Sequence, residues 1–169
     1  MNIRNVEKKD SAQLIELFEL LDSETEFMLF EAGERSISKP EQERIIKEFQ
    51  DSSSKLMLVF ESEDNNTIAG FLVAVGGTVN RNKHSLYCVL GIRQSDTGNG
   101  VGLKLLLEME DWAKNNQFHR LELTVMEHNT RAISLYKLFG FEVEGFKKNS
   151  LKVNGQYVNE HYMSKLIYA

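Results

Sequence analysis

The sequence predicts a mixed α/β domain in which helices flank a central sheet. Residues 86–92 form an apolar run that passes through a glycine-rich turn into an apolar helix. The strand expected at 119–126 is likewise followed by a short helix. The end of the chain reads as two strands joined by Asn154-Gly155, a strong hairpin signal. Strands that alternate with helices and end in a hairpin indicate a mixed sheet.

The first third of the chain predicts one short strand and two helices. Residues 2–6 form the strand, and Asp10 is expected to cap a helix, with Gln13 three residues on as in a capping box. The apolar face of this helix has helical spacing and consists of Leu14, Leu17, Phe18 and Leu21. Ser38 and Glu41 signal a second helix that runs to about Gln50.

The remaining elements follow from similar local signals. Strands are expected at 56–61 and 67–75, and His84 begins the strand that leads to the glycine turn. The helix after the turn is apolar on nearly all sides, so it must pack between the sheet and other elements. Asn129 can cap the next helix and Gly140 can end it. Strands at 141–153 and 156–167 complete the chain.

Composition favours a soluble protein with one domain over residues 1–169. The chain is 41% hydrophobic and 27% charged, which is ordinary for a globular protein. A net charge of −5 argues against a nucleic-acid partner. Cys88 is the single cysteine, which fits a reducing, cytoplasmic compartment. The sequence has neither a secretory signal at its start nor an apolar run long enough for a membrane span.

The glycine turn contains Gly98, Gly100 and Gly102. Glycine permits positive φ and leaves no Cβ in the way of an approaching group. A helix that begins in such a turn offers free N–H groups to a phosphate. The spacing fits neither a Walker A loop nor the dinucleotide fingerprint. The alternative is that these glycines only allow a tight turn at the start of the helix and that the turn binds no ligand.

A second motif makes the interpretation of the glycine turn more specific. Residues 129–141 read Asn-x-x-Ala-x-x-x-Tyr-x-x-x-Gly-Phe, and together with residues 93–102 they resemble the GNAT family of acetyl-CoA-dependent N-acetyltransferases. The resemblance implies a GNAT-like acyl-CoA N-acyltransferase fold, with a mixed, mostly antiparallel sheet. It also implies that the strand at 86–92 bulges and splays from its neighbour.

The resemblance further implies which residues bind acetyl-CoA. The pyrophosphate loop would be Thr97, Gly98, Asn99, Gly100, Val101 and Gly102. Leu90 and Ile92 match the backbone positions that pair with the pantetheine arm, and Asn129 and Tyr136 match residues that contact the cofactor. Thr97 stands where the family has Arg or Gln, and Arg93 or Lys104 could supply the missing cation.

The chemistry of acetyl transfer needs a proton donor for the leaving thiolate and a base for the amine. Tyr136 matches the family's donor, and its phenol is protonated at neutral pH. Glu122 or His84 could act as the base. Ribosomal-protein-type members of the family carry a glutamate where this chain has Thr124.

The segment 22–39 mixes acids with large apolar residues and is expected to form part of the acceptor site. Its candidate residues are Glu26, Phe27, Glu31 and Glu34, and a surface loop that covers the edge of the core is the alternative. Tyr157, His161 and Tyr162 could line the acceptor end. The histidines show no ligand spacing, so no metal site is expected.

The sequence therefore predicts an acetyl-CoA-dependent N-acetyltransferase that acts on a primary amine of a small molecule or of a peptide N-terminus. A non-catalytic CoA-binding or regulatory module on the same fold is the alternative, motivated by Thr97 and by the unclear base. Dimers are common in the family, so a homodimer is considered, although no stretch of the sequence demands one.

Overall fold

The computed structural model describes residues 1–64 and 66–168; residue 65, in the turn between two predicted strands, and residue 169 lie outside the described residues. Seven strands form one sheet in the order β1-β2-β3-β4-β5-β7-β6. The strands are β1 (Asn2–Asn5), β2 (Lys55–Glu61), β3 (Ile68–Gly76), β4 (Ser85–Ile92), β5 (Arg120–Met126), β6 (Glu142–Val153) and β7 (Gln156–Leu166). All neighbours pair antiparallel except β4 and β5, which pair parallel. The predicted mixed, mostly antiparallel sheet is confirmed.

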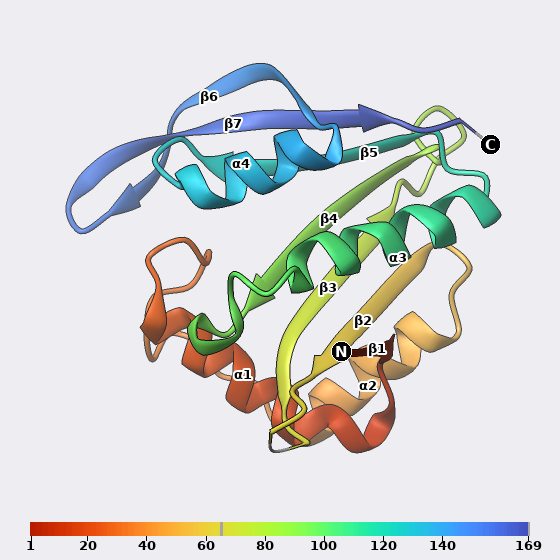
Figure 1. Cartoon of the computed structure of the whole chain (residues 1–169), viewed down its shortest axis with the longest axis vertical. Coiled ribbons are helices and arrows are strands. Elements are labelled where there is room, and N and C mark those ends of the chain that lie inside the picture. The colour runs from red at the N-terminus through yellow and green to blue at the C-terminus, as the bar shows by residue number, and fades with distance from the viewer. Residues whose placement is uncertain (65, 169) are drawn as a thin grey trace.

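Four α-helices pack against this sheet (Figure 1). They are α1 (Ser11–Glu24), α2 (Lys39–Gln50), α3 (Val101–Asn115) and α4 (Thr130–Phe139), with short 3-10 turns at Lys8–Asp10 and Gln94–Asp96. One core lies between the sheet and α3 and α4, and includes the fully buried Leu72, Leu105 and Leu121. A second core lies between β2 and β3 and the helices α1 and α2. Both α1 and α2 pack mainly on β2 and β3, and Leu21 of α1 also reaches Gly91 on β4, so one face of β5, β7 and β6 carries no helix.

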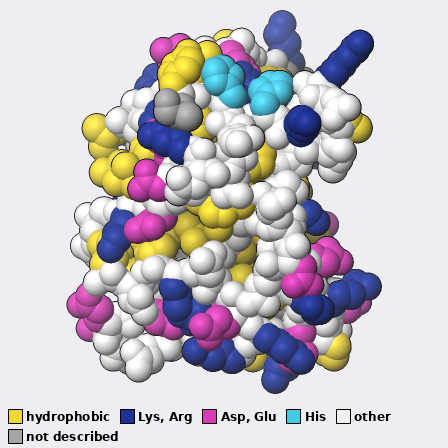
Figure 2. All heavy atoms as spheres, turned by 90° about the vertical axis from the view of Figure 1, so that its right-hand side faces the viewer, with side chains coloured by type: hydrophobic (Ala, Val, Ile, Leu, Met, Phe, Trp, Pro, Cys, Tyr) yellow, Lys and Arg dark blue, Asp and Glu magenta, His cyan; other side chains and the backbone are white. Residues whose placement is uncertain are grey.

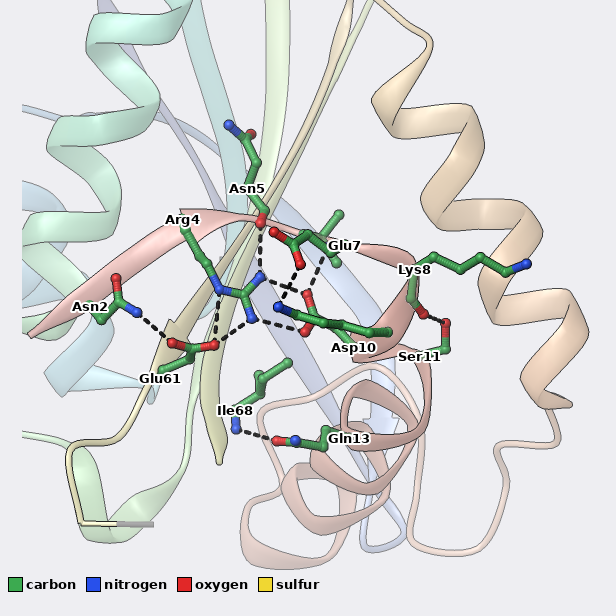
Figure 3. A network of polar contacts seen from close by, with 12 residues as sticks. Asn2, Arg4, Asn5, Glu7, Lys8, Asp10, Ser11, Gln13, Glu61 and Ile68 are labelled. Atoms are coloured by element: carbon green, nitrogen blue, oxygen red, sulfur yellow. Dashed lines mark hydrogen bonds and ion pairs between the residues drawn. The ribbon is translucent and has the colours of Figure 1, made fainter. Parts of the chain in front are cut away.

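The predicted capping box at Asp10 and Gln13 is wrong. Asp10 precedes α1 without a side-chain capping bond, because its carboxylate accepts two hydrogen bonds from Arg4, at 2.8 and 2.9 Å. Figure 3 shows this network, in which Arg4 also reaches Glu61 on β2. Gln13 instead accepts a hydrogen bond from the backbone N–H of Ile68. The Asp10 carboxylate thus binds Arg4, and it caps the preceding 3-10 turn by accepting the N–H of Glu7 at 2.7 Å, but it does not cap α1.

The other local signals are confirmed. Ser38 and Glu41 form the reciprocal capping box at the start of α2. Asn129 caps α4 by accepting the N–H of Ala132, and Gly140 ends that helix with φ +106°. Asn154 and Gly155 both have positive φ, as a type I′ hairpin turn requires.

Strands β4 and β5 stay together over only three residue pairs. They pair from Ser85↔Arg120 to Tyr87↔Glu122 and then separate, which leaves the second half of each strand without a partner on that side. Figure 1 shows the two strands diverging toward the glycine turn. The predicted splay is thus confirmed. The predicted bulge is wrong, because β4 pairs with β3 from Leu86 to Ile92 without a register shift.

Candidate functional site

The opening between β4 and β5 places backbone groups where a ligand can reach them. Leu90 and Ile92 lie on β4 beyond its last pair with β5, and both are half-buried. Those N–H and C=O groups of this segment that face away from β3 therefore have no strand partner. Unpaired backbone groups of this kind can hydrogen-bond an extended chain. The geometry fits the predicted role of these two residues toward a pantetheine arm.

Two of the three glycines in the turn have the backbone conformation expected of a phosphate loop. Gly98 and Gly100 have φ +83° and +79°, and Gly100 is the residue that precedes α3, without any side-chain cap. A Cβ added to Gly100 would meet nothing within 4 Å, so the space in front of this helix end is open. The free N–H groups of the first turn of α3 point into such a space. An anion fits there.

Gly102 is glycine for a different reason. A Cβ on Gly102 would lie 2.7 Å from Cδ2 of Leu135 on α4, closer than real contacts allow. Its missing side chain lets α3 and α4 approach each other. Spacing in the sequence could not separate this packing role from a role in phosphate binding.

The cation nearest to the glycine turn comes from α4. The hydroxyl of Thr97 donates to the carbonyl of Gln94, Arg93 pairs with Asp96 at 2.8 Å, and Lys104 donates to the carbonyl of Met1. Each of these three side chains thus already has a partner within the protein. Arg131 is different, because its Nη2 would lie 3.2 Å from a Cβ on Gly98. The sequence motif contained Arg131, but only the fold brings it to the turn.

Tyr136 is buried in the core that α3 and α4 form with the sheet. Its side chain is 8% exposed and packs edge-to-face on Phe141. Burial, with smaller contributions from Cys88 and Tyr87, raises the pKa of Tyr136 above its ordinary value, so the phenol keeps its proton at neutral pH. Burial also raises the pKa of the Cys88 thiol to about 12, so this neighbour is neutral as well.

The face of β5, β7 and β6 that carries no helix continues onto the part of β4 before Gly91. We call it the open face, and it presents polar and aromatic groups. Side-chain alternation places Tyr87, Val89, Glu122, Thr124, Tyr162 and Ser164 on it. The Tyr87 hydroxyl and Thr124 Oγ1 lie 2.8 Å apart and bridge the two strands just where they separate. A cavity of about 370 Å³ beside this bridge is lined by Tyr87, Glu122, Leu123, Glu144 and Tyr162.

Arg120 ties the carboxylates of this cavity together. Its Nε donates to Oε2 of Glu122 at 2.9 Å, and its two terminal nitrogens bind both oxygens of Glu144. Ser164 also donates to Glu144 at 2.9 Å. Hydrogen bonds from Arg120 lower the pKa of Glu144, which is therefore ionised at neutral pH. Oε1 of Glu122 has no hydrogen-bond partner among the described residues, so it can accept a proton or a water.

A second cavity of about 360 Å³ adjoins the first, since Tyr87 and Glu122 line both. Its other walls include His84, Ser85, Asn82 and Arg120. Figure 2 faces this end of the sheet and shows histidine side chains gathered near the top of the view, with basic and acidic groups interspersed over the surface. The rings of His84 and His119 lie 6.5 Å apart. His84 is exposed in the turn before β4 and lines only this second cavity.

The segment 25–38 divides into two parts. Glu26 binds His128 at 2.8 Å and Asn154 at 3.1 Å, and the Phe27 ring lies 5.0 Å from that of His128. Glu26 and Phe27 therefore lie beside His128, which follows the end of β5, and Glu26 also reaches Asn154 in the β6–β7 hairpin turn. The carboxylate of Glu34 accepts the N–H of Glu31 within its own turn. None of Glu26, Phe27, Glu31 and Glu34 lines either cavity.

Sequence reasoning missed Arg120, Glu144 and Tyr87. Each belongs to a different strand, and no short motif connects them. Alternation along each strand could have placed Tyr87 and Glu122 on outward faces, but it could not have shown that the two residues share the same face. His161 lies on the other side of β7 from Tyr162, against Phe146, and Tyr157 is exposed near the hairpin turn.

The comparisons with known proteins agree with this geometry. The family model described as "Acetyltransferase (GNAT) domain" matches residues 3–162, so the chain belongs to the GNAT acetyltransferase family. The L-amino acid N-acetyltransferase AaaT of Escherichia coli is 41% identical over 68 residues, which cover 40% of this chain and 42% of that protein. The chain spans less than two thirds of the length of the curated relatives it matches.

Two solved structures show the same fold over nearly the whole chain. A GNAT-family acetyltransferase from Streptococcus pneumoniae has a TM-score of 0.92 and 28% identity, with 99% of each chain covered. The yncA protein of Salmonella typhimurium, solved with its cofactor acetyl-CoA, has a TM-score of 0.86 and 19% identity, with 100% of this chain and 95% of that chain covered.

Within residues 1–64 and 66–168, no group of three or more His, Cys, Asp and Glu side chains is placed to hold a metal ion. None of the helices in this part of the chain combines the length and the apolar character that crossing a membrane requires.

Proposed function

We propose that this protein is an N-acetyltransferase that moves the acetyl group of acetyl-CoA to a primary amine by direct attack on the thioester. The observation that carries the proposal is the splay of β4 from β5, with an open glycine turn and a buried tyrosine on one side and a carboxylate-lined cavity on the other. Such an opening lets a thioester and an amine meet from opposite faces of the sheet.

The residues that would hold the cofactor fit its chemistry. The turn at 97–102 and the start of α3 offer N–H groups to the pyrophosphate. Leu90 and Ile92 offer backbone groups to the pantetheine amides. We assign the cation that Thr97 does not supply to Arg131, whose guanidinium lies beside Gly98. Asn129 keeps its helix-capping role, which supports the same turn of α4.

Acetyl-CoA supplies an acetyl group already activated as a thioester. A free backbone N–H near the end of β4 would polarise the thioester carbonyl. Glu122 accepts a proton from the amine, directly or through a water, while the new N–C bond forms. Tyr136 donates its proton to the sulfur as the C–S bond breaks. Protons balance, because the base has gained one and the phenolate left at Tyr136 regains one from solvent.

Glu122 is the better candidate for the base, and His84 the weaker one. Glu122 lies beside the Tyr87–Thr124 bridge and lines both cavities, and its Oε1 has no hydrogen-bond partner among the described residues. His84 lies one residue before the first position of β4 that pairs with β5, and it lines only the second cavity. We expect Glu122→Gln to lower kcat by about 10²-fold and His84→Gln to lower it less than about fivefold.

The test of cofactor binding is a calorimetric titration with acetyl-CoA. We expect Gly100→Val to weaken binding at least tenfold, about 1.4 kcal/mol, because its side chain would occupy the phosphate space. Gly155→Val is the matched control, since Gly155 has φ +80° and equally open surroundings but lies in the distant hairpin turn. Equal binding by both variants, or no binding by the folded wild type, would contradict the proposal.

The same titration tests Arg131. Arg131→Gln should weaken acetyl-CoA binding several-fold and reduce its dependence on salt, because one phosphate contact is lost. Lys137→Gln, on the same helix and also exposed, should change neither. Binding of acetyl-CoA by the folded wild type without acetylation of any amine would favour the non-catalytic CoA-binding module instead.

A further inference from the structure

The charges around the two cavities limit which amines can serve as acceptors. Arg120 is the one permanently charged cation among the residues that line them, and it is already bound to Glu122 and Glu144. Two carboxylates against one guanidinium leave this part of the open face with a net charge of about −1. A carboxylate that entered with the acceptor would have to displace one of them.

The next charged groups on the open face do not change this balance. Lys147 on β6 lies 5.8 Å from the ring of Tyr162, but its Nζ is 3.4 Å from Oε1 of Glu160. Glu160 is 8% exposed and also accepts a hydrogen bond from Ser150. The two cations of the β3–β4 turn, Arg81 and Lys83, are exposed and line neither cavity. Among the described residues, Arg120 is therefore the only Lys or Arg that lines either cavity.

The remaining walls suit a cation with a partly apolar body. The rings of Tyr87 and Tyr162 are 39% and 44% exposed and stand on either side of Glu122 in the same cavity. Exposed tyrosine faces attract ammonium groups and pack well on methylene groups. In the adjoining cavity, Ser85 Oγ is buried without a hydrogen-bond partner among the described residues. A neutral polar group next to the amine, such as an amide, could satisfy it.

We propose that the acceptor is a cationic amine with no free carboxylate beside its amino group: a peptide N-terminus, an amino-acid amide or an alkylamine, but not a free amino acid. This inference rests on the proposed function and commits it to a substrate class. The carboxylates of Glu122 and Glu144, bridged by Arg120, make the selection. Ammonium is attracted to the cavity, and an α-carboxylate is repelled from it.

The experiment compares three acceptors with the same side chain: phenylalanine, phenylalaninamide and phenethylamine, each at saturating acetyl-CoA, with release of free thiol as the readout. Phenethylamine is needed because the amine of an amide has a lower pKa, about 8, and reacts faster for that reason alone. The amine of phenethylamine is no less basic than that of phenylalanine. We expect kcat/KM for both carboxylate-free acceptors to exceed that of phenylalanine at least tenfold.

A pair of variants tests whether the charges in the cavity cause the preference for acceptors without a carboxylate. Glu144→Gln removes one carboxylate from Arg120 and should reduce the preference for phenethylamine over phenylalanine at least threefold. Glu108→Gln is the control, because Glu108 is an exposed carboxylate on α3, across the sheet from the cavities. Its preference should match that of the wild type.

The outcomes separate the two proposals. Equal or better use of phenylalanine by the wild type would overturn the inference and leave the N-acetyltransferase function in place. An unchanged preference in Glu144→Gln would also overturn it, because the charges would then not be the cause. Binding of acetyl-CoA without acetylation of any of the three acceptors, nor of a peptide with a free N-terminus, would overturn the proposed function and this inference with it.

Discussion

The two halves of the sheet, β1–β4 and β5–β7, differ in whether helices cover both faces of their strands or only one. In β2 and β3 nearly every side chain is buried, because α3 covers one face and α1 and α2 cover the other. In β5 burial alternates along most of the strand, and in β7 only Glu160 and Met163 are buried, because α4 and α3 cover only one face. The boundary between the halves is the short parallel pairing of β4 with β5.

The difference teaches where chemistry can be placed in a single sheet. A strand that is buried on both faces has no position free for an ionisable side chain without a cost in stability. A strand that is buried on one face keeps every second position available for polar groups. Glu122, Thr124 and Tyr162 occupy such positions, next to the gap that the divergence of β4 and β5 opens. The proposed acceptor site therefore lies in the half that the helices leave uncovered.

The largest predicted effects test the two-sided burial directly. Phe71→Ala and Leu72→Ala, at adjacent positions of β3, should each cost about 3–5 kcal/mol of unfolding free energy, since both side chains are buried on opposite faces. In β7, Met163→Ala should cost about 2–5 kcal/mol and Tyr162→Ala less than about 1 kcal/mol. Denaturation in urea measures all four. An equal loss at Tyr162 and Met163 would mean that the open face is covered in solution.

The second prediction concerns the ion pairs of the two halves. Arg4→Gln should cost about 3 kcal/mol at pH 7, because it leaves the buried carboxylate of Asp10 without its cation. Arg120→Gln should cost less than about 1 kcal/mol, since Glu122 and Glu144 are more than a third exposed. Lys47→Gln, which removes an exposed pair with Asp51, is the control and should cost least.

The cost of Arg4→Gln should depend on pH in a defined direction. Burial alone would raise the pKa of Asp10, but hydrogen bonds from Arg4 and from the N–H of Glu7 outweigh it, and the pKa of Asp10 in the folded protein is lowered. A lowered pKa contributes stability above the unfolded value, about 4, and that stability is lost as the pH falls through the folded value. The wild type and Arg4→Gln should therefore converge in stability below about pH 4. A constant gap down to pH 3 would contradict the assignment.

The third prediction sharpens the comparison at the boundary itself. Tyr136→Phe should lower kcat by about 10²-fold, because the thiolate loses its proton donor. Its unfolding free energy should change by less than about 0.5 kcal/mol, since the hydroxyl makes no hydrogen bond with the described residues. Acetyl-CoA binding should be unaffected. A large loss of stability together with the loss of activity would assign Tyr136 to packing alone.

The smallest effect concerns the contact between the two helices that flank the boundary. Gly102→Ala should cost about 1–2 kcal/mol, because its Cβ would meet Leu135 on α4. Combined with Leu135→Val, it should cost less than the sum of the two single changes. Gly145→Ala, whose Cβ would meet only Tyr162 at 3.9 Å, should be close to neutral. Strict additivity at Gly102 and Leu135 would contradict the packing explanation.

The sequence alone determined the features that depend on neighbours a few residues away. The capping box at Ser38, the caps of α4, the hairpin turn at Asn154 and the glycine turn all act within one or two turns of chain. The family motifs are also continuous segments, so their place in the fold and the identity of Tyr136 followed from them.

Only the tertiary structure decided which distant groups share a site. Asp10 has a good local signal for capping α1, yet its carboxylate binds Arg4 instead. A hydrogen bond from a charged guanidinium to a carboxylate is stronger than one from a backbone N–H. Arg131 reaches Gly98, and Arg120 joins Glu122 to Glu144, only after strands far apart in the sequence have paired. Charge at an active site depends on such long-range pairing, and the periodicity of a single strand carries no information about its neighbours.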